Sequence, residues 1–121
     1  MAKPSKVSLE KMPWEKVRDD FQRRIVSGEK LMVAQLSIAK GAKVAFHRHF
    51  HEQFTIVLQG MIKFVFEDGV EFVAGKNEVV VIPSNAGHEA EALEDCVTFD
   101  IFAPPREDWL TGSDDYLRQK S

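Results

Sequence analysis

The four histidines of the chain are the residues whose types and spacing could do chemistry. His47, His49 and His51 fall within five residues, and His88 follows much later in the sequence. On an extended strand His47 and His49 point to the same face, so one backbone segment can present two imidazoles to one ion. Gln53 would point to the same face as these histidines if a turn lies between them. The sequence therefore predicts a metal site formed by His47, His49, Gln53 and His88.

A histidine on a strand is more often a hydrogen-bonded structural residue than a metal ligand. What favours a metal here is that every histidine of the chain lies in one of two places bounded by turns. His51 is interpreted as a turn residue or as a hydrogen-bond donor to a ligand residue.

The predicted ligands are electrically neutral, which determines the chemistry of the ion. Three imidazoles and one amide leave the charge of a divalent cation uncompensated, so the cation is a strong Lewis acid for a carboxylate, hydroxyl or enolate oxygen. Sites rich in imidazole accept zinc, nickel, manganese or iron. Iron oxygenases more often use two histidines and a carboxylate, so Gln53 weakens an oxygenase interpretation.

Three residues near the end of the chain could act on a bound molecule. Asp100 and Phe102 share one face of a strand, which makes Asp100 a candidate general acid or base and Phe102 a candidate cover for the ligand. Arg106 carries a planar fork suited to a carboxylate. Each residue also has a structural alternative. Asp100 could be a hydrogen-bond acceptor paired with Arg106, and Phe102 could be an ordinary core aromatic. Arg106 could be a solvated arginine beside Glu107 and Asp108.

Short strands must position these residues, because β-branched and aromatic segments alternate with turn signals such as Asp68-Gly69. An all-β sandwich or barrel is expected, with short helical turns at 106–110 and 114–118. We expect an N-terminal arm or added strand at 1–20, a barrel at 21–105 and a tail at 106–121. The predicted strands are 22–26, 30–39, 43–49, 54–58, 61–67, 70–73, 78–82 and 96–102, and another strand begins at His88.

The strands at 53–59 and 99–102 each have one mixed face and one fully apolar face. Gln53 and Asp100 lie on the mixed faces, whereas Phe54 and Phe99 lie on the apolar ones. A pocket on the mixed side is expected, with another sheet or a second subunit on the apolar side. This pattern favours a homodimer.

Composition excludes several classes of partner. The net charge of -3 leaves no basic surplus for nucleic acid, and no apolar run approaches the ~20 residues that cross a bilayer. No secretory signal is recognised, and the single Cys96, expected to be an inert, partly buried thiol, fits a cytoplasmic protein. Trp14 and Trp109 are expected to anchor the chain ends, and Arg24 is a possible second contact for an anion.

Two segments resemble the sequence motifs of the cupin family. Residues 41–60, GAKVAFHRHFHEQFTIVLQG, keep every spacing of G-x5-H-x-H-x3-E-x6-G, with Gln53 where glutamate is usual. Residues 75–88, GKNEVVVIPSNAGH, resemble G-x5-P-x-G-x2-H, with a longer first gap and Asn85 in place of the glycine. Asparagine tolerates a positive φ better than other non-glycine residues. The resemblance implies a double-stranded β-helix, also called a cupin or jelly-roll barrel.

A narrower resemblance rests on H-x-H-x-H-E-Q together with DIFAPPREDWL at 100–110. These segments are similar to the KdgF-type small cupins of pectin degradation, which help convert 4,5-unsaturated monouronates into linear keto-deoxyuronates. The resemblance implies an isomerase-like or hydratase-like enzyme with a small sugar-acid substrate. It also implies which residues act: His47, His49, Gln53 and His88 on the metal, and Asp100, Phe102 and Arg106 on the substrate.

Two other functions stay open at this point. The first is a non-catalytic cupin that holds a metal and a small acid in order to sense or sequester it. The second is a metal-dependent dioxygenase. The fold alone does not decide among them, because cupins carry out many chemistries.

Overall fold

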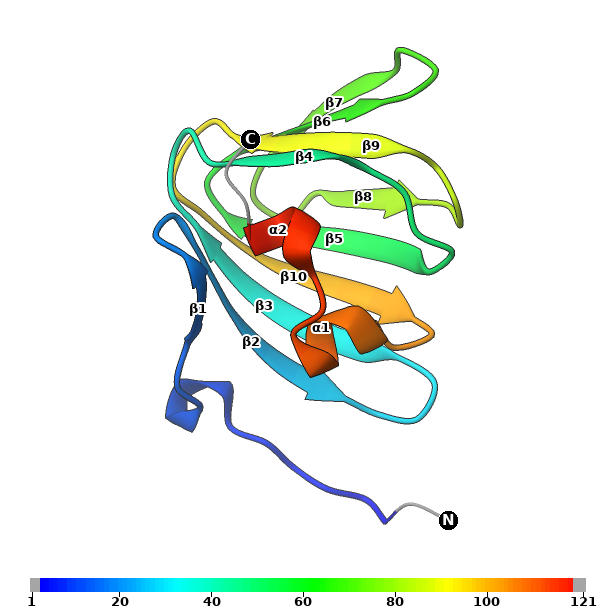
Figure 1. The fold of residues 1–121 in the computed structure, drawn as a ribbon. Helices are drawn as coiled ribbons and strands as arrows, with labels where there is room; N and C mark the ends of the chain where they lie inside the picture. Colours follow the sequence, from blue (N-terminus) through cyan, green and yellow to red (C-terminus); the bar gives the residue numbers. More distant parts are fainter. Residues whose placement is uncertain (1–2, 119–121) are drawn as a thin grey trace.

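Two antiparallel β-sheets face each other and enclose the core in the computed structural model, which describes residues 3–118 (Figure 1). The six-stranded sheet has the order β1-β2-β3-β10-β5-β8, and the four-stranded sheet has the order β4-β9-β6-β7. The strands of the first sheet are β1 (Glu15–Arg18), β2 (Phe21–Ser27), β3 (Met32–Ile38), β10 (Cys96–Ala103), β5 (Glu52–Gln59) and β8 (Val79–Ile82). Those of the second are β4 (Lys43–His47), β9 (His88–Ala92), β6 (Ile62–Phe66) and β7 (Glu71–Ala74).

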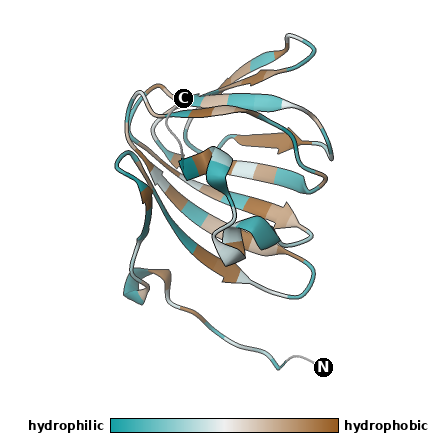
Figure 2. Ribbon diagram, viewed as in Figure 1, coloured by the Kyte–Doolittle hydropathy of each residue, from teal (hydrophilic) through white to brown (hydrophobic). Residues whose placement is uncertain are grey.

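Alternating burial explains why these segments form strands. Every second residue of β3 and β10 is buried, and the residues between them are only partly covered. The inward side chains of β3 are apolar, whereas β10 turns Thr98, Asp100 and Phe102 inward together. Figure 2 shows this change of hydropathy from residue to residue along the strands. The mixed face expected for the strand at 99–102 is therefore an inner face of the barrel.

Turns with positive φ connect the strands where the sequence indicates them. Gly69 has φ 89° in the turn between β6 and β7, and Asn85 has φ 64° in the connection before β9. Asn85 thus adopts the backbone conformation that was expected of it as a substitute for glycine. Gly60 has φ 83°, and a Cβ there would lie 2.2 Å from the carbonyl oxygen of Asp95. Only glycine fits that turn.

The two ends of the chain are joined through Arg23 of β2. A 3-10 turn at Leu9–Lys11 precedes β1, which pairs with β2 at the edge of the sheet. After β10 come two short helices, α1 (Glu107–Thr111) and α2 (Asp115–Arg118), which lie across the open side between the sheets (Figure 1). The fully buried Arg23 and Asp114 form an ion pair, and Glu15 also accepts a hydrogen bond from Arg23. The division of the chain at residues 20 and 105 stays a prediction.

One sequence expectation needs adjustment and another is confirmed. The strand expected at 43–49 ends at His47, so His49 lies in the connection to β5 and not on the same strand. The two helical turns expected near the C-terminus are present as α1 and α2. Among the described residues, no helix has the length and hydropathy needed to cross a membrane.

Candidate metal centre

Three histidines converge at one end of the four-stranded sheet. His47 is the last residue of β4 and His88 the first residue of β9, and the two are directly opposite each other in the register of these strands. His49 reaches the same place from the connection after β4. One side-chain nitrogen from each histidine lies within 4.8 Å of the others. The ring centres of His47 and His88 are 4.4 Å apart.

Backbone carbonyls fix the orientation and tautomer of all three rings. The Nδ1 atom of each histidine lies at hydrogen-bond distance from a carbonyl oxygen, which can only accept, so Nδ1 carries the proton. In the neutral rings Nε2 is therefore the nitrogen with a free lone pair. The three carbonyls are those of Ala45 for His47 at 2.9 Å, His51 for His49 at 3.1 Å and Ala86 for His88 at 2.8 Å.

The environment keeps these imidazoles neutral. Desolvation by burial, followed by the charge of His88, lowers the pKa of His47 to about 4. Burial and the nearby Arg106 lower the pKa of His49 to about 3, and burial lowers the pKa of His88 as well. Near neutral pH the rings are in the form that binds metal ions.

The Gln53 side chain turns its oxygen toward the histidines. Its Nε2 donates to Thr55 Oγ1 at 2.9 Å and to Asp100 Oδ2 at 3.1 Å, which fixes the direction of the amide. Its Oε1 lies 3.1 Å from Nε2 of His49. Both of these atoms are acceptors, because the His49 proton is on Nδ1 and the ring is neutral. Two lone pairs at this distance repel each other unless a cation lies beside them.

Asp100 is buried next to Gln53 and is hydrogen-bonded to it. Its Oδ1 accepts a hydrogen bond from Thr98 at 2.9 Å, and its Oδ2 accepts the one from Gln53. Burial raises the pKa of Asp100 to about 7, although hydrogen bonds from Thr98 and Thr55 act in the opposite direction. The pKa of this carboxyl group thus lies well above the usual range of an aspartate.

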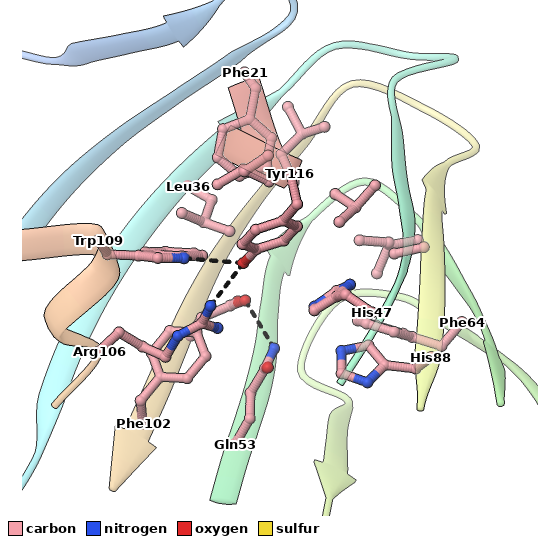
Figure 3. A pocket seen from close by; sticks show the side chains of 16 residues that line it. Phe21, Leu36, His47, Gln53, Phe64, His88, Phe102, Arg106, Trp109 and Tyr116 are labelled. Atoms are coloured by element: carbon pink, nitrogen blue, oxygen red, sulfur yellow. Dashed lines mark hydrogen bonds between the residues drawn. The ribbon is translucent and has the colours of Figure 1, made fainter. Parts of the chain in front are cut away.

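The expected alternative that Asp100 pairs with Arg106 is wrong. Arg106 instead binds Asp108 with two of its nitrogens, at 3.0 and 2.8 Å, and donates to the Tyr116 hydroxyl at 2.8 Å. The expected alternative of a solvated arginine is also wrong, because Arg106 is buried. Its guanidinium carbon lies 5.2 Å from the ring centre of Phe102, which is itself fully buried (Figure 3).

One cavity of about 40 Å³ brings the candidate site together (Figure 3). It is lined by six of the seven residues that the sequence pointed to: His47, Gln53, His88, Asp100, Phe102 and Arg106. The seventh, His49, lies against Gln53. The cavity also extends into the apolar core, so polar groups occupy only part of its wall.

Sequence reasoning missed Tyr116, Asp108, Thr55 and Thr98. The two threonines share the strand faces of Gln53 and Asp100, so alternation along the strands could have found them. No sequence signal places Tyr116, because only the docking of α2 against the barrel brings it to the cavity.

Three further expectations concern residues outside the cavity. Arg24 does not contact it, because its guanidinium carbon lies 4.0 Å from the ring centre of Trp14 and it donates to Gln35. The His51 ring stacks on Phe50, with ring centres 4.0 Å apart, and its centre lies 5.5 Å from that of His49. The His51 carbonyl oxygen accepts the hydrogen bond of His49 Nδ1. Cys96 is buried and free, and burial raises the pKa of its thiol to about 11.

These residues fit a divalent cation. Nε2 of His47, His49 and His88 and Oε1 of Gln53 are neutral donors from the two facing sheets and from the connection between β4 and β5. Imidazole with amide oxygen suits zinc, nickel, manganese or iron. Because Oε1 of Gln53 and Nε2 of His49 have no proton between them, a cation would replace a repulsion by two bonds.

The fold and the site define a two-sheet β-barrel with a histidine cluster at its open side. The family model of the cupin domain matches residues 34–102, more than half of the chain, and this protein belongs to the cupin family. Its fold is accordingly the all-β double-stranded β-helix that the sequence motifs predict.

Several solved structures are similar to this chain. KdgF from Halomonas sp. is 30% identical, with a TM-score of 0.77, over 83% of this chain and 94% of that one. An RmlC-like cupin from Shewanella frigidimarina NCIMB 400 is 27% identical, also with a TM-score of 0.77, over 83% and 90% of the two chains. An RmlC-like cupin from Desulfovibrio desulfuricans, 24% identical with a TM-score of 0.67, shares the fold over 87% of this chain and all of its own. No curated protein sequence matches.

Proposed function

We propose that this cupin is a metal-dependent enzyme that acts on a small acidic sugar and converts 4,5-unsaturated uronates into linear keto-deoxyuronates. The observation that carries the proposal is the convergence of a histidine cluster, a buried carboxyl group and a buried arginine on one cavity. The similarity to KdgF supports the choice of substrate.

The metal would be held by His47, His49, His88 and Gln53. When bound, it supplies a Lewis acid that stabilises negative charge on a substrate oxygen. The neutrality of the four ligands leaves its charge available for that purpose.

Arg106 binds the carboxylate of the uronate. Asp108 and Tyr116 hold the guanidinium through Nε and Nη2, and no hydrogen bond from Nη1 occurs among residues 3–118. Nη1 can therefore donate to a substrate oxygen. Phe102, which lies against both Arg106 and His49, forms an apolar wall for the sugar ring.

Asp100 transfers the proton. The conversion is an isomerisation in which the C1 hydroxyl loses a proton, the bond between C1 and the ring oxygen breaks, and the released enolate gains a proton at C4. A single group can accept the first proton and deliver the second. The Asp100 pKa, raised to about 7 by burial, lies close to the working pH, as general acid–base catalysis requires.

The test is the loss of ultraviolet absorbance of an unsaturated monouronate with the purified, metal-loaded protein. Asp100→Asn is expected to lower kcat by about 10²-fold or more. Arg106→Ala is expected to raise KM by about 10-fold or more because a charged hydrogen bond is lost. Undiminished turnover in both variants would contradict the assigned roles.

The small size of the cavity favours a second candidate function, the binding of a metal and a small acid without turnover. A cavity of about 40 Å³ holds only a few water molecules, which is less than the volume of a sugar ring. Calorimetry distinguishes the two functions: binding of the uronate with no chemical change in it would support the non-catalytic one.

We further propose that the protein is a homodimer that covers the outer face of the six-stranded sheet. Val79, Val81 and Phe54 are 50%, 49% and 39% exposed there, next to the half-buried Phe99 and Ile101. No part of the described chain covers these apolar side chains. Sedimentation is expected to give twice the mass of 13.8 kDa, and Val81→Lys to give a monomer.

A further inference from the structure

Tyr116 brings a hydroxyl group from the C-terminal helix α2 to the metal-binding side of the cavity. Its ring centre lies 4.8 Å from that of His47, and Figure 3 shows its oxygen between Trp109 and Arg106. Only the docking of α2 puts this group there. The cavity wall thus includes a polar atom that the cupin motifs do not contain.

The hydroxyl oxygen of Tyr116 accepts two hydrogen bonds, but its own proton is not donated to any described residue. Arg106 Nη2 lies at 2.8 Å and Trp109 Nε1 at 3.0 Å, and both of these nitrogens can only donate. They occupy the two lone pairs of the phenol oxygen. Among residues 3–118, no group accepts a hydrogen bond from Tyr116 in return. A phenol keeps its proton at neutral pH, so the group is still able to donate.

The second unused donor of the cavity is on the neighbouring residue. Arg106 uses Nε and Nη2 for Asp108 and Tyr116, which leaves Nη1 without a partner among the described residues. The Tyr116 O–H and the unpaired N–H of the Arg106 guanidinium lie on one cavity wall and suit two oxygens of one anion. The donations from Arg106 and Trp109 also hold the phenol ring in a fixed position for that task.

We propose that Tyr116 is a ligand-binding residue whose hydroxyl donates a hydrogen bond to the carboxylate that Arg106 binds. This inference rests on the proposed function for the class of ligand, a monouronate. It assigns to the C-terminal helix a contact that determines specificity, because a neutral sugar offers no carboxylate to the two donors.

The test uses the metal-loaded protein and galacturonate, a saturated monouronate that has no double bond and is not turned over. By isothermal calorimetry, Tyr116→Phe is expected to bind galacturonate at least about 10-fold more weakly, as for the loss of a hydrogen bond to a charged group. The affinity for the metal is expected to stay close to that of the wild type, whereas the melting temperature is expected to fall by a few degrees, because Arg106 and Trp109 lose their common acceptor.

Tyr116 is the single tyrosine of the chain, which gives a second measurement. Protein grown with 3-fluorotyrosine carries one fluorine label, next to the hydroxyl in question. Its fluorine resonance is expected to shift on titration with galacturonate, with the same midpoint as the calorimetry, and not to shift with galactose. This measurement does not depend on the folding of a variant.

The outcomes separate the inference from the proposed function. Unchanged galacturonate affinity in Tyr116→Phe, no binding to the wild type, or weaker binding accompanied by an equal loss of metal affinity would each overturn the inference. The last result would show that Tyr116 only supports the structure. In another outcome, the wild type binds galacturonate, Tyr116→Phe binds it more weakly, and the wild type does not turn over the unsaturated uronate. That result would overturn the proposed enzymatic function and leave the assignment of Tyr116 intact.

Discussion

At the residue scale, the hydrogen bond from Gln53 to Asp100 explains why position 53 has an amide, whereas many cupins have a carboxylate there. Nε2 of Gln53 donates to the buried Asp100, and a glutamate has no N–H to donate. A second carboxylate there would face the first across 3.1 Å in a buried place. The amide therefore lets a buried acid and a metal ligand lie next to each other.

Gln53→Glu is accordingly expected to destabilise the metal-free protein by roughly 3 kcal/mol, because two buried carboxylates come into contact. Urea unfolding in the presence of a chelator measures this. The double variant Gln53→Glu with Asp100→Asn restores a donor and an acceptor at the two positions, so it is expected to recover most of the loss. Additive losses in the double variant would contradict a direct coupling between the two residues.

The three neutral histidines make the stability of the metal-free protein depend on pH. Their folded pKa values are lowered, to about 4 for His47 and about 3 for His49, from an ordinary 6.5. Between pH 6.5 and 4 the unfolded chain binds more protons, so stability falls as the pH falls through this window. Asp100 acts in the opposite direction between 3.8 and about 7, because its pKa is raised, but it is one group against three.

Urea midpoints of the chelated protein at pH 7.5 and pH 5.5 test this expectation. The midpoint is expected to be lower at pH 5.5. A variant with asparagine at positions 47 and 49 is expected to show a smaller difference. Equal midpoints of the wild type at the two pH values would show that these rings do not titrate as their burial implies.

Residue types and spacing were enough to predict six of the cavity-lining residues, because ligand chemistry and strand parity both depend on local sequence. The hydrogen-bond partners were harder to predict. Arg106 pairs with Asp108, its neighbour but one, and not with Asp100, because β10 ends before the arginine and the chain turns away at Pro104 and Pro105. A turn of that kind is set by tertiary packing.

At the scale of the elements, α2 depends on its contacts with the barrel, because it is too short to be stable alone. A helix of four residues has no stability of its own, so the buried ion pair of Asp114 with Arg23 and the burial of Leu117 must fix it. The sequence indicated the two short helices but not where they dock. The docking depends on Arg23, which lies 91 residues before its partner Asp114 in the chain.

Asp114→Ala is expected to cost about 3 kcal/mol of stability, because it leaves part of the fully buried Arg23 charge without its partner. Urea unfolding provides the measurement. Asp115→Ala, an exposed change at the first residue of α2, is the matched control and is expected to stay within about 0.5 kcal/mol of the wild type. Similar losses of stability in the two variants would contradict the conclusion that the ion pair of Asp114 with Arg23 fixes α2.

At the scale of the whole molecule, the candidate ligands come from both sheets. His47 and His88 belong to the four-stranded sheet, and Gln53 belongs to β5 of the six-stranded one. An ion bound by all of them fastens the sheets to each other. Because the unfolded chain does not hold these residues together, the binding energy of the ion adds to the stability of the fold.

Metal at about 100 times its dissociation constant is expected to stabilise the protein by about 2.7 kcal/mol, or on the order of 10 °C in melting temperature. Thermal melts with chelator and with zinc or nickel measure the difference. The variant His88→Ala is expected to lose most of the shift, whereas Arg48→Ala, on an exposed arginine in the same region, is expected to keep it. A shift of the same size in both variants would mean that the metal binds elsewhere.

The overall architecture followed from the sequence more completely than the site did. Eight of the strands were expected from composition and turn signals, and the ninth and tenth correspond to the segment at His88 and to the added strand near residue 15. Which strands pair with which, such as β10 between β3 and β5, depends on contacts far apart in the sequence. Local patterns carry no information on such pairs.

The contact between Glu15 and Arg118 has a consequence for the order of the chain. These residues are 103 positions apart in sequence, yet their side chains lie 3.0 Å from each other. A short linker could therefore connect the first strand to the last helix, and new ends could be opened at the exposed hairpin of Asp68 and Gly69. Such a circularly permuted protein is expected to fold and to keep its histidine cluster, because every element would retain its neighbours in space.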